Sequence, residues 1–235
     1  MNKINLNNIS ISPGHSQKGQ HCYIKALFEQ IGTTNKYYVD IGAYNGRTNS
    51  NVYDLKVRDN WYGLMIDNHY ENASLNLHKY TVTQDNICGI FKQFNVPVDI
   101  DLLCIDIDGM DYWILQSILE RFSPRVIIIE TNVRFDTNDS KVMKYKEEYN
   151  WNGIDWYGCS PHAVKKLVNQ HNYTPIYMHY DDMIIVRNDN LKQEDIDTPW
   201  KTIYPGPNFE LYADHVKAHH PNPVMAPIDE DWIEV

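Results

Sequence analysis

The sequence is poor in long apolar runs and in positive charge, and each shortage excludes a class of protein. No apolar run approaches the roughly 18 residues that a membrane-spanning helix needs. The N-terminal stretch MNKINLNNISISPGHSQKGQ lacks the apolar core of a secretory signal. The 21 Lys and Arg residues are outnumbered by 31 Asp and Glu, and the net charge of −10 disfavours a nucleic-acid-binding surface. These shortages predict a soluble, cytoplasmic protein with no membrane and no nucleic-acid partner.

Cysteine is also scarce, with four residues scattered along the chain and no C-x-x-C pair. Disulfide scaffolds and structural zinc sites depend on paired cysteine spacings, so neither is expected. We predict free thiols at Cys22, Cys88, Cys104 and Cys159.

Apolar, β-branched runs alternate with segments of helical spacing, which indicates βαβ units and a mostly parallel sheet. The predicted strands are 37–41, 61–67, 80–83, 101–106 and 125–131. The predicted helices are 50–59, 69–79, 87–95, 112–122 and 160–171. Two further strands, 173–179 and 182–188, are close enough to pair antiparallel. We expect an α/β fold with a Rossmann-like, doubly wound sheet, helices on both faces and a C-terminal antiparallel strand pair.

The composition divides the chain into two parts. Residues 1–190 carry the alternating pattern and are expected to form one domain. Residues 191–235 are acidic, rich in proline and aromatic residues, and without a sustained period. We expect them to form an extended tail that packs on the domain or on a neighbouring subunit, which would make a homo-oligomer. The tail histidines His215, His219 and His220 fit a solvated surface better than a metal site.

A glycine-containing loop, DIGAYNG at residues 40–46, follows the first predicted strand. Gly42 and Gly46 would let the backbone turn tightly and approach a ligand. The loop does not match the G-x-G-x-x-G dinucleotide fingerprint, and a plain strand-to-helix turn is the alternative interpretation. Asp67 ends the second strand, where an acid can bind ribose hydroxyls, and Asp85 and Asn86 follow the third. Each of these acids also fits an ordinary helix cap.

Together these segments resemble a class I S-adenosylmethionine-dependent methyltransferase, and more closely an FkbM-like methyltransferase-domain protein. The resemblance is carried by HSQKGQ (15–20), VDIGAYNGRTNSN (39–51), YGLMID (62–67), DNI (85–87) and LCIDIDGMDYW (103–113). It covers about residues 15–190 and does not explain the tail. The common form of the glycine loop has an acid where this chain has Asn45.

The resemblance implies S-adenosylmethionine as cofactor and assigns residues to it. The glycine loop would hold the methionine part, Asp67 the ribose and the position after the third strand the adenine, while Asp106 would face the cofactor. The implied cofactor-binding residues are Asp40, Gly42, Ala43, Tyr44, Gly46, Asp67, Asn68, Asp85, Asn86 and Asp106.

Three acids, Asp106, Asp108 and Asp111, follow the fourth strand and admit other interpretations. A calcium-binding EF-hand loop beginning at Asp106 would put Met110 and Ser117 at ligand positions, so that interpretation fails. The D-x-D-G pattern also resembles the nucleophile motif of haloacid-dehalogenase-like phosphatases. That motif normally lies on the first strand and has Thr or Val where this chain has Met110. The phosphatase therefore stays as an alternative.

The fifth predicted strand ends in Glu130 and Asn132, next to the fourth in the expected sheet. By resemblance to sugar and catechol O-methyltransferases, Asp108 and Glu130 are candidate Mg²⁺ ligands, with Asn132 third. A metal-free polar site is the other interpretation. A general base is needed only if the acceptor hydroxyl must lose its proton, and the candidates are Asp108, Glu130 and His162.

The expected function is methyl transfer from S-adenosylmethionine to a small-molecule acceptor, such as the hydroxyl of a sugar. The alternatives are a catalytically idle cofactor-binding or assembly protein with the same fold, and the phosphatase. Trp151, Trp156 and Tyr157 lie in the long loop before the last predicted helix. They would either stack on the acceptor or close the core over the fifth strand.

Overall fold

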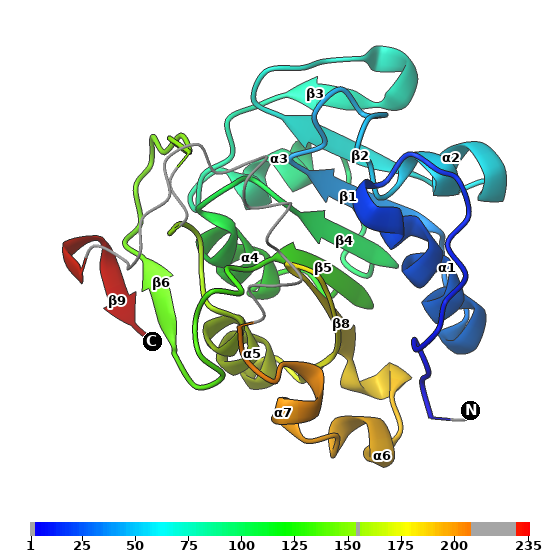
Figure 1. Ribbon diagram of the computed structural model, residues 1–235. Coiled ribbons are helices and arrows are strands. Elements are labelled where there is room, and N and C mark those ends of the chain that lie inside the picture. Colours follow the sequence, from blue (N-terminus) through cyan, green and yellow to red (C-terminus); the bar gives the residue numbers. More distant parts are fainter. Residues whose placement is uncertain (1–2, 154–155, 208–228) are drawn as a thin grey trace.

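The computed structural model describes residues 3–153, 156–207 and 229–235. A seven-stranded sheet in the order β3-β2-β1-β4-β5-β8-β7 forms its centre (Figure 1). The first five strands are parallel, and β8 pairs antiparallel with both β5 and β7. The strands are β1 (Tyr37–Ile41), β2 (Tyr62–Asp67), β3 (Leu77–Lys79), β4 (Leu102–Ile105), β5 (Val126–Glu130), β7 (Tyr173–His179) and β8 (Asp182–Arg187). The predicted Rossmann-like sheet with its antiparallel pair is confirmed.

The central strands are apolar on both faces because helices cover both sides of the sheet. Every residue of β1 and β4 is buried. Strand order reverses between β1 and β4, which creates the switch point at which open α/β sheets bind ligands. The sheet therefore predicts a ligand site beyond the carboxyl ends of these two strands.

Helices pack on both faces of the sheet and divide the core in two. Tyr38 of β1 packs in the core that contains α1 and α2, whereas its neighbour Val39 packs in the core that contains the other three long helices. This division follows from the alternation of side chains along a strand. The long helices are α1 (Gln20–Ile31), α2 (Tyr53–Asp59), α3 (Ile87–Gln93), α4 (Asp111–Leu119) and α5 (Pro161–Gln170). In α5, Ser160 is the N-cap and its side chain accepts from the Ala163 N–H, as predicted.

The region between β2 and α3 differs from its prediction. The expected helix 69–79 is wrong: only the 3₁₀ turn η2 (Ala73–Leu75) forms there, followed by β3. The side chain of Asn72 caps that turn, and Asn76 takes a left-handed φ of 58° that reverses the chain. Asn side chains favour such local hydrogen bonds over continuous helix. The expected strand 80–83 is consequently a loop, because the strand already ends at Lys79.

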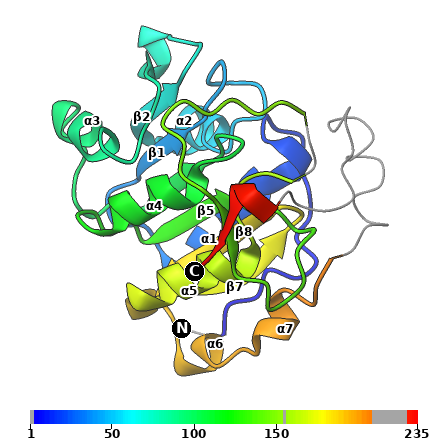
Figure 2. The ribbon, with the colours of Figure 1, turned by 90° about the vertical axis from the view of Figure 1, so that its left-hand side faces the viewer.

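The tail begins with short helices and returns to the domain as a strand. After η3 (Asn188–Asn190) come α6 (Gln193–Ile196) and α7 (Trp200–Ile203), and η4 (Asp229–Asp231) precedes β9 (Trp232–Glu234). β9 pairs antiparallel with β6 (Lys141–Met143), a strand that the sequence did not predict. Figure 1 shows this pair apart from the main sheet, and Figure 2 shows the C-terminal end close to α5. Residues 208–228, with the three tail histidines, lie outside the described residues.

Two predictions made from absences can be compared with the structure. The described helices include none that is both long and apolar enough to cross a membrane. All four cysteines are free thiols, as predicted.

The short helix η1 (Gln17–Gly19) precedes α1, and neither element was predicted from the sequence.

Candidate functional site

A cavity of about 480 Å³ opens at the carboxyl ends of β1, β2, β4 and β5. Its walls include the last residues of these strands, and it lies at the switch point of the sheet. Nine of the residues predicted to be functional line it: Asp40, Gly42, Ala43, Tyr44, Asp67, Asn68, Asp106, Asp108 and Glu130.

The glycine loop is fitted tightly between the ends of β2 and β4. The backbone N–H groups of Gly42 and Ala43 donate to the Ile66 carbonyl at 2.9 and 3.0 Å. Gly42 has φ +87°, and a Cβ there would lie 1.6 Å from the backbone oxygen of Asp106. Only glycine satisfies both the left-handed backbone and this approach. Gly46 does not line the cavity, and a Cβ at that position would meet Leu75 at 2.9 Å.

Asp67 connects the loops that follow β1 and β2. Its carboxylate accepts from the backbone N–H of Tyr44 at 2.8 Å, of His69 at 2.8 Å and of Tyr70 at 3.1 Å. Tyr44 has a positive φ of 48°, which is uncommon for a non-glycine residue. The acid at the end of β2 thus fixes the shape of the cavity and also faces it.

Asp40 is 6% exposed and faces the cavity from β1. The Ser50 hydroxyl donates to its carboxylate at 3.5 Å. Burial raises the pKa of Asp40 to about 7, and the nearby Asp67 adds to the increase while Ser50 opposes it. Asp40 is therefore near its titration midpoint at neutral pH.

Asp106, Asp108 and Glu130 form an acidic group deep in the cavity. One carboxylate oxygen from each lies within 4.8 Å of the others. Asp106 and Asp108 keep exposed surface, and both line the cavity. Burial raises the pKa of Asp106 and of Glu130 well above the usual range, and the neighbouring acids raise them further. Burial also raises the pKa of Asp108.

The third acid after β4, Asp111, folds the loop that carries Asp108. Its carboxylate accepts from the backbone N–H of Ile107 at 2.9 Å and of Gly109 at 2.8 Å. Asp108 takes a left-handed φ of 55° inside this loop. Burial raises the pKa of Asp111 to about 6, although the two N–H donors lower it. The strand ends at Ile105, so this turn, rather than continued strand, directs Asp108 to the cavity.

Glu130 and Asn132, which share the end of β5, have different surroundings. The Tyr157 hydroxyl donates to Glu130 Oε1 at 2.8 Å. The Asn132 amide donates to the Tyr157 carbonyl at 3.1 Å and accepts from the Arg134 N–H at 3.1 Å. Asn132 is buried and does not line the cavity, so it holds the loop that carries Tyr157.

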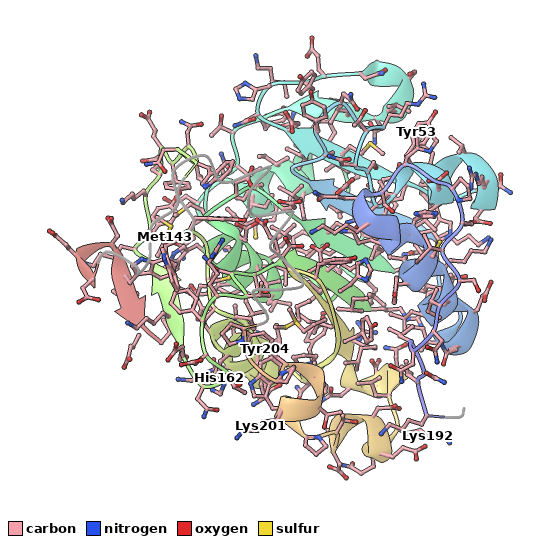
Figure 3. The ribbon with its side chains drawn as sticks, in the orientation of Figure 1. Tyr53, Met143, His162, Lys192, Lys201 and Tyr204 are labelled. Atoms are coloured by element: carbon pink, nitrogen blue, oxygen red, sulfur yellow. The ribbon has the colours of Figure 1, made fainter. Side chains whose placement is uncertain are left out.

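Three further predicted site residues lie away from the cavity. Asp85 is exposed, and the Asn86 side chain closes a turn by accepting from the Thr83 N–H at 2.8 Å and donating to the Thr81 carbonyl at 2.9 Å. His162 Nδ1 lies 3.1 Å from the Thr137 carbonyl, and its ring packs against Trp200 of α7. Figure 3 labels His162 near Lys201, which also belongs to α7. In place of Asp85 and Asn86, the cavity has Tyr80, Thr81 and Val82.

A second part of the cavity wall comes from residues 147–151 and from Tyr157, which the sequence places in a long loop of undecided role. Glu147, Tyr149, Asn150, Trp151 and Tyr157 all line the cavity. The aromatic residues of this loop were a signal of a ligand contact, but their sequence alone did not show which of them face it. Trp156, also singled out from the sequence, packs against Phe135 instead.

Acidic side chains predominate among the charged residues that line the cavity. No lysine or arginine lines it within the described parts of the chain, whereas seven acids do: Asp40, Asp67, Asp106, Asp108, Glu130, Glu147 and Asp181. One of them, Asp181, pairs with Lys18 at 3.4 Å. A cavity with this balance attracts cations and opposes phosphate and other anions.

The fold and the cavity together define an α/β protein of Rossmann-like architecture with an acid-lined cavity at the switch point. No family model and no curated protein matches the chain. Among solved structures, a SAM dependent methyltransferase from Aquifex aeolicus is similar at 12% sequence identity and a TM-score of 0.36. The similarity covers 69% of this chain and 87% of that chain, and a likeness of this size says nothing about activity.

Proposed function

We propose that the protein binds S-adenosylmethionine and transfers its methyl group to a hydroxyl of a small polar acceptor such as a sugar. The observation that carries this proposal is the acidic cavity beside the glycine loop, at the carboxyl ends of β1, β2, β4 and β5. S-adenosylmethionine carries a sulfonium and an ammonium group, and its single carboxylate leaves it a net cation. Its charge therefore suits this cavity, whereas a phosphate-bearing dinucleotide does not.

The described residues fit such a cofactor part by part. The methionine portion would lie against the glycine loop, with Asp40, Gly42, Ala43 and Tyr44, and with Asp106 beside the sulfonium. The ribose would lie at Asp67 and Asn68. A carboxylate has about four lone-pair positions, and Asp67 uses three of them for backbone N–H groups, which leaves room for a ribose hydroxyl. Tyr80, Thr81 and Val82 would take the place proposed for Asp85 and Asn86 at the adenine.

Bound S-adenosylmethionine supplies a methyl group that is already activated by the positive sulfur. The protein therefore has to hold the acceptor oxygen in line with that methyl group and to exclude competing water. Asp108 and Glu130 are the general-base candidates inside the cavity, because both carboxyl groups line it. His162 lies beside α7, outside the cavity lining, and is assigned no step.

A magnesium ion is the alternative to a protein base. Asp106, Asp108 and Glu130 are the residues that would hold it, since all three offer oxygen ligands within 4.8 Å of one another. Asn132 would not be a ligand, because its amide bonds with the Tyr157 carbonyl and the Arg134 N–H. It would hold the loop that carries Tyr157. Bound Mg²⁺ would lower the pKa of an acceptor hydroxyl.

Two other functions compete with this proposal. A cofactor-binding protein without catalysis would use the same cavity and differ only in having no turnover. A phosphatase would need a cationic side chain or a metal ion for its phosphate ester. The described cavity lining contains neither lysine nor arginine, so a phosphatase would depend on a metal ion at Asp106, Asp108 and Glu130. The charge of the cavity therefore favours the methyltransferase over the phosphatase.

Isothermal titration with S-adenosylmethionine and S-adenosylhomocysteine, each with and without Mg²⁺, tests the proposal. Both compounds should bind, and Asp67→Ala should weaken binding by roughly tenfold or more, since it removes a charged hydrogen-bond acceptor. Asp85→Ala is the matched control, because Asp85 is exposed and outside the cavity lining. If neither compound binds, the proposal is wrong. If the two variants weaken binding equally, the cofactor does not bind in the pocket assigned to it.

A further inference from the structure

The acceptor side of the cavity combines aromatic rings with carboxylates. The Tyr149 ring packs directly on the loop after β4, since a Cβ on Gly109 would lie 2.1 Å from its Cε1 atom. The rings of Trp151 and Tyr157 lie 5.7 Å apart at an angle of 52°. All three rings line the same cavity as Asp108, Glu130 and Glu147.

This combination suits one kind of chemical group. A protonated amine gains from the negative face of an aromatic ring and from a nearby carboxylate at the same time. A neutral polyol would satisfy hydrogen bonds but leave the acidic charges without a counter-charge, so their mutual repulsion would remain. An anionic group would meet like charge from every side.

We propose that the methyl acceptor carries a positively charged amino group, as an amino sugar does, and that Glu147 and the rings of Tyr149 and Trp151 bind it. That the bound molecule is the methyl acceptor rests on the proposed function. The cation site itself is inferred from the residues that line the cavity. The amine would be a recognition group, and a hydroxyl elsewhere on the same molecule would take the methyl group.

The aromatic rings separate this proposal from a metal site. Magnesium selects oxygen ligands and keeps its water shell, so it gains nothing from ring faces. The oxygen-rich group Asp106, Asp108 and Glu130 is complete without Glu147, which lies on the aromatic segment. A cation site that includes Glu147 is therefore a site for an organic cation.

Matched pairs of probes that differ in charge test the inference. Glucosamine is compared with glucose, and benzylamine with benzyl alcohol, by titration at neutral pH with and without saturating S-adenosylhomocysteine. Each amine should bind roughly tenfold more tightly than its neutral partner, and added salt should reduce the difference.

Glu147 and Glu148 provide matched variants, because both are exposed and adjacent but only Glu147 lines the cavity. Glu147→Gln should remove most of the preference for amines, while Glu148→Gln should leave it intact. Trp151→Leu should also reduce the preference. Circular dichroism of each variant checks that the fold is retained.

The outcomes separate this inference from the proposed function. If S-adenosylhomocysteine binds but neither amine is preferred over its neutral partner, the inference is wrong and the cofactor proposal stands. If neither cofactor compound binds but Glu147→Gln abolishes an amine preference, the cation site stands without the methyltransferase. A third outcome is that no amine is preferred and that Mg²⁺ binds in a way that depends on Asp106 but not on Glu147. The acids of the cavity would then bind a metal ion, and the inference would be wrong.

Discussion

The two ends of β4 carry aspartates in opposite electrostatic situations. Asp101, just before the strand, is fully buried and pairs with Arg125 at 2.7 Å. Its carboxylate also accepts from the backbone N–H groups of Thr34, Asn35 and Lys36 at distances of 2.7 to 3.0 Å. Asp106, just after the strand, lies beside Asp108 and Glu130, and no cationic side chain of the described residues pairs with it.

The difference separates a structural acid from a ligand-binding one. A buried charge with a cationic partner and several donors is compensated inside the protein. A group of carboxylates without a cation keeps an unfavourable repulsion that a positively charged ligand can relieve. The acid at the amino edge of the sheet is therefore expected to contribute stability, whereas the acids at the carboxyl edge cost stability that a bound cation would restore.

Removing the charge at each edge tests this comparison most strongly. Asp101→Asn should lower the free energy of unfolding by about 3–5 kcal/mol, because it leaves Arg125 buried without its counter-charge. Asp106→Asn should leave that free energy unchanged or raise it by about 1 kcal/mol, because it removes repulsion. Denaturant unfolding of both variants measures the two values. Equal losses would mean that Asp106 has a compensating partner and that the two edges are alike.

The same contrast explains what could be predicted from the sequence. Apolar, β-branched runs that end in an acid marked the ends of β1, β2, β4 and β5, so Asp40, Asp67, Asp106 and Glu130 were all assigned to one edge. The parallel sheet then brought them to one cavity. Strand length and burial are local properties of the chain, and this part of the prediction is confirmed by the fold.

The parts that depend on short elements or distant contacts were not predictable. β3 has three residues, and the turn chemistry of Asn72 and Asn76 moved its end before residue 80, so the third strand end was misplaced. The pairing of β6 with β9 joins segments far apart in the chain. Tyr149 and Trp151 line the same cavity as the acids because of the path of a long loop. Loops lack the repeating sequence pattern from which helices and strands are predicted, so this path could not be predicted.

Glycines at the two edges give a second, smaller contrast. Gly42→Ala should lower the free energy of unfolding by more than about 3 kcal/mol and prevent ligand binding, because its Cβ would meet the Asp106 backbone oxygen at 1.6 Å in addition to the backbone strain. Gly32 at the amino edge has φ +68° and ψ 171° but nothing within 4 Å of an added Cβ, so Gly32→Ala should cost only backbone strain of about 1–3 kcal/mol. Thermal or denaturant unfolding measures both. A Gly42→Ala loss no larger than the Gly32→Ala loss would contradict the close fit of the loop on β4.

The pH dependence of stability provides the last and smallest test. Burial raises the pKa of Asp40 from 3.8 to about 7, so the folded protein holds this proton more tightly than the unfolded chain. As pH rises from about 4 to 7, the unfolded chain loses the proton first, and stability falls over that interval. Asp40→Asn removes this cost, and at pH above 7 it should raise the free energy of unfolding by roughly 2 kcal/mol. That value is smaller than the full linkage, because the cavity admits water.

Unfolding measured from pH 4 to 8 in wild type and Asp40→Asn checks this expectation. The two curves should be closest at pH 4, where ionisation of Asp40 in the unfolded chain has only begun to lower the stability of wild type, and should separate as pH rises to 7. Parallel curves would mean that Asp40 is compensated like Asp101, and the carboxyl edge would then lack the unpaired charge that makes it a binding site.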